Sequence, residues 1–71
     1  YTTSLFEEGL PKILAKVEEE SEEVVRAGRE ETCDRLAEET ADLLYHTWVL
    51  LAEKNVSLEE VVAVLERRAK E

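Results

Sequence analysis

The sequence predicts an all-α protein, an antiparallel helical bundle that homodimerisation completes. Apolar residues recur at helical spacing along most of the chain. Gly occurs twice and Pro once, and the sequence has neither the alternating pattern of strands nor a hairpin turn signal. A chain of 71 residues with one cysteine cannot form an intrachain disulfide, so helix packing, a bound metal or association must stabilise its small core.

Length and charge narrow the possible functions. Residues 1–71 are enough for a single domain. Lys and Arg number 9 against 18 Asp and Glu, and the formal charge of −9 argues against nucleic acid or an anionic membrane as the main partner. No segment is apolar for long enough to span a membrane, and no signal peptide opens the chain. The single cysteine suits a reducing compartment, so we expect a cytoplasmic protein.

A short helix is expected at the start of the chain. Thr3 or Ser4 can cap it, because their hydroxyl groups accept hydrogen bonds from the first turn. We expect this helix to extend through Glu8 and to end at Gly9, a residue that adopts the left-handed conformation without a steric penalty. Pro11 then fits the first turn of a second helix.

Two long helices should follow one another in the middle of the chain. The second helix is expected to run to about Ala27 and to end at Gly28. The third is expected to run from about Glu31 to Glu53, and from Ala41 onward it is apolar nearly all round. A helix that is apolar on every side is normally buried, so this one should be the central and most buried helix.

The end of the chain predicts a turn and a fourth helix. Lys54 and Asn55 make the turn, and Asn55 tolerates the left-handed conformation. Ser57 and Glu60 have the spacing of a capping box, in which each side chain binds the backbone N–H of the other residue. The inward-facing residues of this helix are expected to be Leu58, Val61, Val62, Leu65 and Ala69.

Two pairs of carboxylates lie on helix faces that otherwise point toward the core. Glu20 and Glu23 interrupt the apolar stripe of the second helix, and Glu39 and Asp42 open the apolar run of the third. Residues three apart share one helix face. Because burying a bare carboxylate is costly, four such acids need protons or a cation. A hard divalent cation prefers oxygen ligands, so the pattern predicts a site for Mg²⁺, with Mn²⁺ as the alternative, and suggests phosphate chemistry.

The same acids have a simpler explanation, and several other residues have more than one possible role. Acid pairs in an acidic helical chain are usually solvated, as they would be in a non-catalytic helical dimerisation module. Lys16 either neutralises a substrate phosphate or pairs with Glu19 or Glu20. His46 is expected to be a hydrogen-bonded core or interface residue, and Trp48 a core or dimer-interface residue. The remaining basic residues of the first half are expected to be solvated, with a phosphate contact as the alternative: Lys12, Arg26, Arg29 and Arg35.

Three local patterns carry a resemblance to a known family. They are the opening residues 1–6 with 9–13, an E-E-x-x-E element of Glu19, Glu20 and Glu23 preceded by Lys16, and an E-x-x-D element from Glu39 to Asp42 that continues as A-D-L-L-Y-H to His46. The two acidic elements resemble the all-α NTP pyrophosphohydrolase (MazG-like) superfamily. The opening segment and the A-D-L-L-Y-H string resemble, within it, the phosphoribosyl-ATP pyrophosphohydrolase family.

The resemblance implies a reaction and a set of ligands. The reaction is Mg²⁺-dependent hydrolysis of the α–β phosphoanhydride of phosphoribosyl-ATP to phosphoribosyl-AMP and pyrophosphate, in histidine biosynthesis. The implied metal ligands are Glu20, Glu23, Glu39 and Asp42, with Glu19 close by as a ligand or acting through water. A metal-activated water, positioned by one carboxylate, would attack phosphorus.

The sequence also leads to expectations about binding partners and leaves alternative functions. We expect a homodimer whose paired helices form a bundle of four or more, with the active site near the interface. Some relatives of the family are fused to a cyclohydrolase domain. The resemblance therefore implies a phosphoribosyl-AMP cyclohydrolase as a possible fused or associated partner. The alternatives are a housekeeping NTP or dNTP pyrophosphohydrolase of the same superfamily, which shares the acids, and the non-catalytic module.

Overall fold

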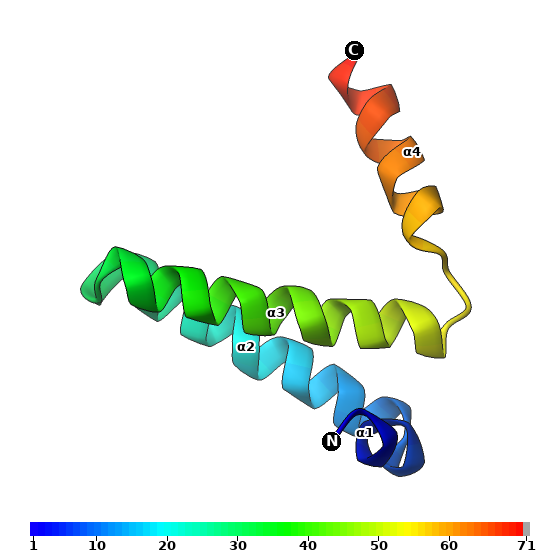
Figure 1. The fold of residues 1–71 in the computed structure, drawn as a ribbon, viewed down its shortest axis with the longest axis horizontal. Helices are drawn as coiled ribbons and strands as arrows, with labels where there is room; N and C mark the ends of the chain where they lie inside the picture. The colour runs from blue at the N-terminus through cyan, green and yellow to red at the C-terminus, as the bar shows by residue number, and fades with distance from the viewer. Residues whose placement is uncertain (71) are drawn as a thin grey trace.

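The computed structural model describes residues 1–70, which form four helices and no strand. The helices are α1 (Thr2–Glu8), α2 (Leu10–Glu30), α3 (Cys33–Glu53) and α4 (Leu58–Ala69). The two long helices α2 and α3 lie side by side and are joined by a short turn, α1 folds back at the other end, and α4 points away from the pair (Figure 1). The all-α prediction is therefore confirmed for the described part of the chain. None of these helices combines the length and the apolar character needed to cross a membrane.

The first helix begins earlier than the sequence predicted. Tyr1, rather than Thr3 or Ser4, occupies the N-cap position, and its side chain makes no capping hydrogen bond. Ser4 lies inside the helix, where its hydroxyl donates to the Tyr1 carbonyl at 2.7 Å. Gly9 ends the helix with the expected positive φ of 84°, but its ψ of −174° is extended and not left-handed helical. An L side chain would be strained at this φ, so the turn between α1 and α2 depends on glycine.

The turn between the two long helices also lies beyond the predicted position. Helix α2 continues through Gly28 and ends at Glu30, because one helical glycine costs only about 1 kcal/mol and does not force a helix to stop. Helix α3 begins at Cys33 and not at residue 31. Its N-cap is Thr32, whose hydroxyl oxygen accepts a hydrogen bond from the backbone N–H of Arg35 at 3.2 Å.

The predicted signals before α4 are confirmed. Asn55 has a φ of 58°, the left-handed conformation that asparagine tolerates. Ser57 and Glu60 form the capping box in both directions: the Glu60 N–H donates to Ser57 Oγ at 3.1 Å, and the Ser57 N–H donates to Glu60 Oε2 at 2.7 Å. These signals are local, which is why the sequence alone sufficed to find them.

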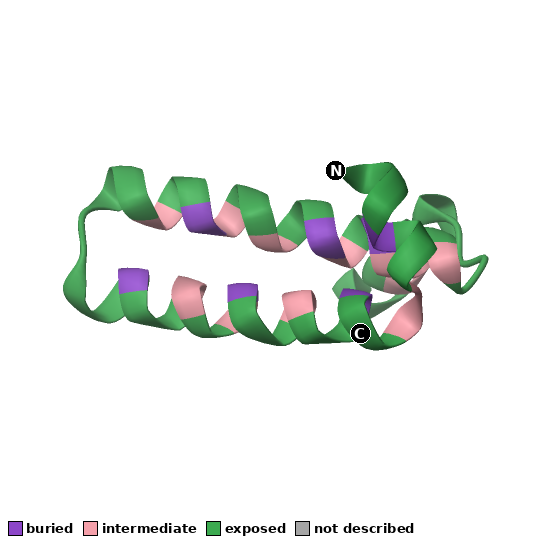
Figure 2. Cartoon of the chain, turned by 90° about the horizontal axis from the view of Figure 1, so that it is seen from below, coloured by how far each residue is buried: buried purple, intermediate pink, exposed green. Residues whose placement is uncertain are grey.

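The buried core is small and lies where α1, α2 and α3 meet. Leu5, Ile13 and Val49 form its centre, and Leu50 packs against them. Figure 2 shows that the buried residues follow the sides of α2 and α3 that face each other. Helix α4 has no buried residue, so the prediction that its apolar side chains point inward is wrong for the single chain.

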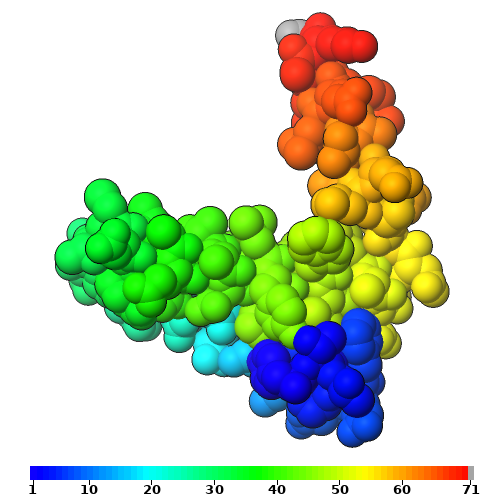
Figure 3. Space-filling model, viewed as in Figure 1, coloured from blue at the N-terminus to red at the C-terminus, as the bar shows by residue number. Residues whose placement is uncertain are grey.

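Much apolar surface of α3 and α4 is therefore uncovered. Leu44 is 63% exposed and Trp48 is 57% exposed, so α3 is not the fully buried central helix that the sequence predicted. The physical reason is that, among the described helices, α2 alone runs along α3, α1 meets α3 near one end, and α4 extends outward as an arm (Figure 3). The radius of gyration of 13.9 Å exceeds the value of about 11 Å that is typical of a compact domain of this length.

A hydrogen-bonded aromatic contact holds the N-terminus against α3. The Tyr1 hydroxyl lies 2.9 Å from His46 Nε2, and His46 Nδ1 lies 2.8 Å from the Asp42 carbonyl oxygen. Because a carbonyl only accepts, Nδ1 carries the proton, and Nε2 therefore accepts from Tyr1. The ring of Tyr45 lies edge-on to that of His46, with centroids 5.0 Å apart. His46 is thus a buried, hydrogen-bonded residue, as the sequence predicted.

We expect Tyr1→Phe to lower the free energy of unfolding by about 1 kcal/mol, because the substitution leaves the buried His46 Nε2 without its hydrogen-bond partner. The ring remains, so only the donor to His46 Nε2 is lost. Urea denaturation at neutral pH measures this change. An unchanged denaturation midpoint would show that Tyr1 does not make this contact in solution.

Candidate metal centre

Three of the four predicted ligands meet between the two long helices. Glu20 and Glu23 on α2 and Glu39 on α3 each offer a carboxylate oxygen, and these oxygens lie within 4.8 Å of one another. Helical spacing places the three side chains on the sides of α2 and α3 that face each other. Glu20 is 5% exposed and Glu39 is 6% exposed, whereas Glu23 is half-buried. We call these three residues the carboxylate cluster.

The other two predicted acids lie outside the carboxylate cluster. Asp42 is exposed and offers no oxygen to the group of three, although its charge contributes to a raised pKa of Glu39. Glu19 is also exposed, and its carboxylate accepts a hydrogen bond from Lys16 Nζ at 3.4 Å. Lys16 therefore pairs with the neighbouring acids, one of the two roles that the sequence left open.

Each buried acid has one oxygen near a cation and one oxygen without a partner. Lys16 Nζ lies 3.6 Å from Glu20 Oε1, and Arg35 Nη2 contacts Glu39 Oε1. The Oε2 atoms of Glu20 and Glu39 are buried, and neither has a hydrogen-bond partner among the described residues. Buried polar atoms nearly always have partners, and a cation, a shared proton or a water molecule would satisfy these two oxygens. Carboxylate oxygens in this number and at this spacing suit Mg²⁺ or Mn²⁺.

The surroundings of Glu39 change the pKa of its carboxyl group. The pKa of Glu39 is raised, first because its carboxyl group can share a proton with the neighbouring carboxyl group of Glu23, then by burial and by repulsion from the charges of Glu23 and Asp42. Such sharing requires that one of the two carboxyl groups keeps its proton, because ionised carboxylates only accept. Arg35 acts in the opposite direction and lowers the pKa of Glu39.

We expect the free energy of unfolding of the metal-free protein to fall as the pH rises through the pKa of Glu39. The ordinary value is 4.5, and the folded value lies above it, so the folded state binds the proton more tightly than the unfolded state. The resulting stabilisation is complete below pH 4.5 and is lost as the pH rises through the folded-state pKa. Urea denaturation in EDTA over a pH series tests this, with Glu39→Gln as the control that lacks the titrating group. Parallel pH profiles for the two proteins would contradict the prediction.

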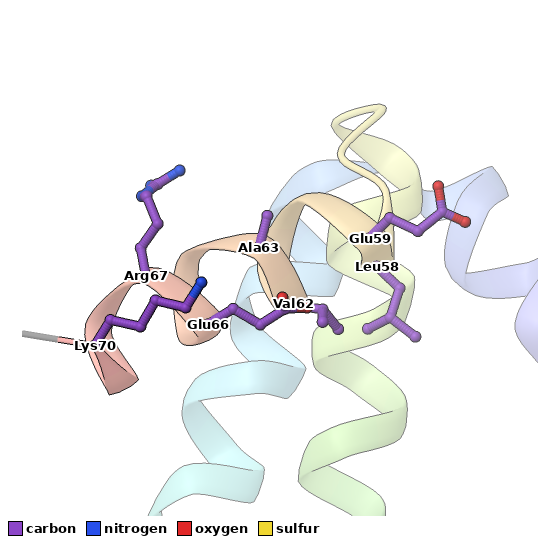
Figure 4. A pocket seen from close by; sticks show the side chains of 7 residues that line it. All are labelled: Leu58, Glu59, Val62, Ala63, Glu66, Arg67 and Lys70. Atoms are coloured by element: carbon purple, nitrogen blue, oxygen red, sulfur yellow. The ribbon is translucent and has the colours of Figure 1, made fainter.

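A separate groove lies on the arm, away from the carboxylate cluster. Figure 4 shows the side chains that line it, which come from α4 and from its C-cap residue Lys70: Leu58, Glu59, Val62, Ala63, Glu66, Arg67 and Lys70. None of the five predicted site acids lines this groove. Because a groove on a single helix brings no acids from a second helix, we place the candidate chemistry at the carboxylate cluster.

The contact between Arg35 and Glu39 was not predicted from the sequence. Arg35 was expected to be solvated, yet its guanidinium contacts Glu39 of the carboxylate cluster. The spacing of four residues between Arg35 and Glu39 is the signal that could have found this contact.

Comparison with known proteins identifies the family. The family model described as "Phosphoribosyl-ATP pyrophosphohydrolase" matches residues 1–69. A phosphoribosyl-ATP pyrophosphatase of Listeria welshimeri is 59% identical over 96% of this chain, and one of Streptococcus gordonii is 56% identical over 96%. A histidine biosynthesis bifunctional protein of Caldanaerobacter subterraneus is 50% identical over 99% of the chain.

The chain matches only part of each of these relatives. It spans 65% of the length of the two pyrophosphatases and 34% of the length of the bifunctional protein. The match itself covers almost every residue of this chain and includes all four predicted ligands, Glu20, Glu23, Glu39 and Asp42. On this evidence the chain belongs to the phosphoribosyl-ATP pyrophosphohydrolase family.

Proposed function

We propose that this chain provides the metal centre of a phosphoribosyl-ATP pyrophosphohydrolase of histidine biosynthesis. The observation that carries the proposal is the meeting of Glu20, Glu23 and Glu39 between α2 and α3, with buried carboxylate oxygens that lack a partner. The family match and the names of the relatives support the choice of substrate. The reaction adds water across the α–β anhydride of phosphoribosyl-ATP, so that phosphoribosyl-AMP and pyrophosphate are released.

The residues of the carboxylate cluster fit Mg²⁺, and Mn²⁺ is the alternative. Glu20, Glu23 and Glu39 would hold the ion, and Asp42, less than one turn further along α3, is the proposed fourth ligand. A bound divalent ion would offset the charge on the phosphate oxygens and lower the pKa of the attacking water. One carboxylate accepts the proton that this water loses, and Glu19 is proposed to act at the edge of the site through water.

Lys16 is the proposed phosphate-binding residue of α2. Its ammonium group lies between Glu19 and Glu20, at 3.4 and 3.6 Å, and its side chain is 19% exposed. Partial burial lowers the pKa of Lys16, but the hydrogen bond to Glu19 and the charge interactions with Tyr1, Glu19 and Glu20 together outweigh it, so the pKa of Lys16 is raised and the group stays charged. A fixed positive charge beside the carboxylate cluster would attract a phosphate of the substrate.

A homodimer is proposed because one chain leaves so much apolar surface uncovered. A hollow between α3 and α4 is lined by Leu44, Thr47, Trp48, Leu51, Leu58 and Val61. A second hollow lies between α1 and α3, and Phe6, Tyr45 and Trp48 contribute to it. Exposed apolar surface of this kind marks an interaction site. A second copy packing on this surface would complete an antiparallel bundle and place the metal centre near the interface.

The charge of the chain and the length of its relatives bear on the location and the partner of the proposed enzyme. The net charge of −9 opposes binding to nucleic acid or to an anionic membrane, and a cytoplasmic enzyme is proposed. The bifunctional relative is about three times the matched length, since the chain spans 34% of it. A phosphoribosyl-AMP cyclohydrolase, which would consume the product, is therefore the proposed fused or associated partner.

The test of the function is pyrophosphate release from phosphoribosyl-ATP, with ATP and the common dNTPs assayed in parallel, in Mg²⁺ and in EDTA. We expect Mg²⁺-dependent release from phosphoribosyl-ATP alone. Release only from simple nucleotides would favour a housekeeping NTP or dNTP pyrophosphohydrolase. No release from any nucleotide would favour a non-catalytic helical dimerisation module with solvated acids.

A further inference from the structure

Arg35 bridges three carboxylates at the edge of the metal centre. Its Nε lies 3.3 Å from Glu31 Oε1, its Nη1 lies 2.9 Å from Glu38 Oε2, and its Nη2 contacts Glu39 Oε1. The side chain is 47% exposed, so Arg35 is accessible to solvent beside the carboxylate cluster. Glu31 and Glu38 are largely exposed, which leaves Glu39 as the only buried acid among the three.

The position of Arg35 is unfavourable for the helix that carries it. Arg35 lies in the first turn of α3, where the positive end of the helix dipole repels a cation. It also precedes Glu39 by four residues, and this order of cation and acid is the less favourable one for helix stability. Lys16 precedes Glu20 on α2 in the same order. Of the two acids four residues from Arg35, Glu31 stands in the favourable order and Glu39 does not, so helix stability does not explain the contact with the buried Glu39.

We propose that Arg35 changes partners during the cycle: it neutralises Glu39 while the site holds no metal, and it binds a substrate phosphate once a divalent ion takes over the charge of Glu39. This inference rests on the proposed function of the carboxylate cluster as a metal site. The sequence left a phosphate contact open for Arg35 as for three other basic residues, and the contact with Glu39 distinguishes Arg35 from them.

Charge and reach both favour this exchange. A divalent ion between the three cluster acids supplies the positive charge that Arg35 gives Glu39 in its absence, and it repels the guanidinium. The bonds to Glu31 and Glu38 keep the side chain at the site after Glu39 has released it. The planar guanidinium fork matches phosphate oxygens better than an ammonium group does, and a substrate phosphate bound to the ion must lie beside Glu39.

The first arm of the test measures metal alone. Arg35→Met keeps the apolar stem but removes the charge, so Mn²⁺ no longer competes with a guanidinium for Glu39. We expect the dissociation constant for Mn²⁺, followed by electron paramagnetic resonance of the free ion, to fall by about threefold to tenfold. Arg68→Met on the α4 arm removes the same charge far from the carboxylate cluster and is expected to leave this constant unchanged.

The second arm measures pyrophosphate binding in saturating Mg²⁺, by calorimetry. Losing a charge-assisted hydrogen bond to phosphate should weaken binding of pyrophosphate to Arg35→Met by about tenfold or more. Arg35→Lys keeps the charge without the fork, so we expect its Mn²⁺ affinity to match the unaltered protein and its pyrophosphate affinity to lie between the other two. A purely structural role for Arg35 would not move the two affinities in opposite directions.

The outcomes separate this inference from the proposed function. Tighter Mn²⁺ and weaker pyrophosphate binding in Arg35→Met support the exchange of partners. Affinities that are both unchanged or both weakened overturn it, and so does tighter Mn²⁺ binding with unaltered pyrophosphate binding. If the unaltered protein binds no Mn²⁺, the metal site itself is wrong, and the role of Arg35 is overturned with it.

Discussion

Replacing Glu39 with Gln is expected to lower kcat/KM for phosphoribosyl-ATP by about 10²- to 10⁴-fold, as expected when several kcal/mol of metal-based stabilisation are lost. The amide removes the charge that a metal ligand needs. The fold should survive in EDTA, because the substitution also removes one of the carboxylates that repel one another in the carboxylate cluster. Pyrophosphate release and urea denaturation in EDTA measure the two effects.

The control for this substitution is Glu66→Gln on α4. It makes the same chemical change at an exposed position on a helix that contributes nothing to the carboxylate cluster. Turnover should remain at the unaltered level in this variant. If Glu39→Gln retained activity within threefold of the unaltered enzyme, the buried acids would not be metal ligands of the reaction.

Replacing Trp48 with Glu is expected to separate the proposed dimer into monomers at micromolar concentration. Truncating or charging a tryptophan at the centre of an interface typically costs about 2–4 kcal/mol, which weakens association by about 30-fold to 1,000-fold. Trp48 is the natural target, because it lines both apolar hollows of the uncovered surface. Sedimentation equilibrium over a concentration series measures the change.

Val25→Glu is the matched control for the dimer. Val25 on α2 is 55% exposed, almost as exposed as Trp48, but it lines neither of the two hollows. The added negative charge is the same, so this variant should dimerise normally. A monomeric unaltered protein, or equal dissociation of both variants, would argue against an interface on the α3 and α4 surface.

Local sequence signals predicted the helices well. They failed where ending a helix and continuing it differ little in free energy. The capping box of Ser57 and Glu60 and the left-handed Asn55 were found because their partners lie within a few residues. Gly28 did not end α2, since the cost of a helical glycine is small beside the hydrogen bonds and packing that continue through it. Helix boundaries therefore carry errors of a few residues even where the helices themselves are evident.

The burial of α4 could not be predicted from the sequence of one chain. An amphipathic helix indicates that an apolar face is covered, but not whether the same chain or another copy covers it. The uncovered faces of Trp48 and Leu65 show this difference directly. The prediction of inward-facing residues on α4 assumed a partner within the chain, and the structure provides none among the described residues.

The carboxylate cluster was predictable in part. The spacing of three residues and the apolar surroundings pointed to Glu20, Glu23 and Glu39, which the structure brings together. Spacing alone cannot fix a side-chain rotamer, and Asp42 accordingly lies outside the carboxylate cluster although it follows Glu39 by three residues. The counter-charge from Arg35 depends on a long and flexible side chain, so it became clear only from the contacts.

Mn²⁺ titration of the unaltered protein, followed by electron paramagnetic resonance, tests the central claim most directly. The carboxylate cluster predicts saturable binding that Glu23→Gln and Glu39→Gln weaken strongly and that Glu66→Gln does not change. The absence of saturable binding to the unaltered protein, or equal affinity in all four proteins, would contradict a metal site between α2 and α3.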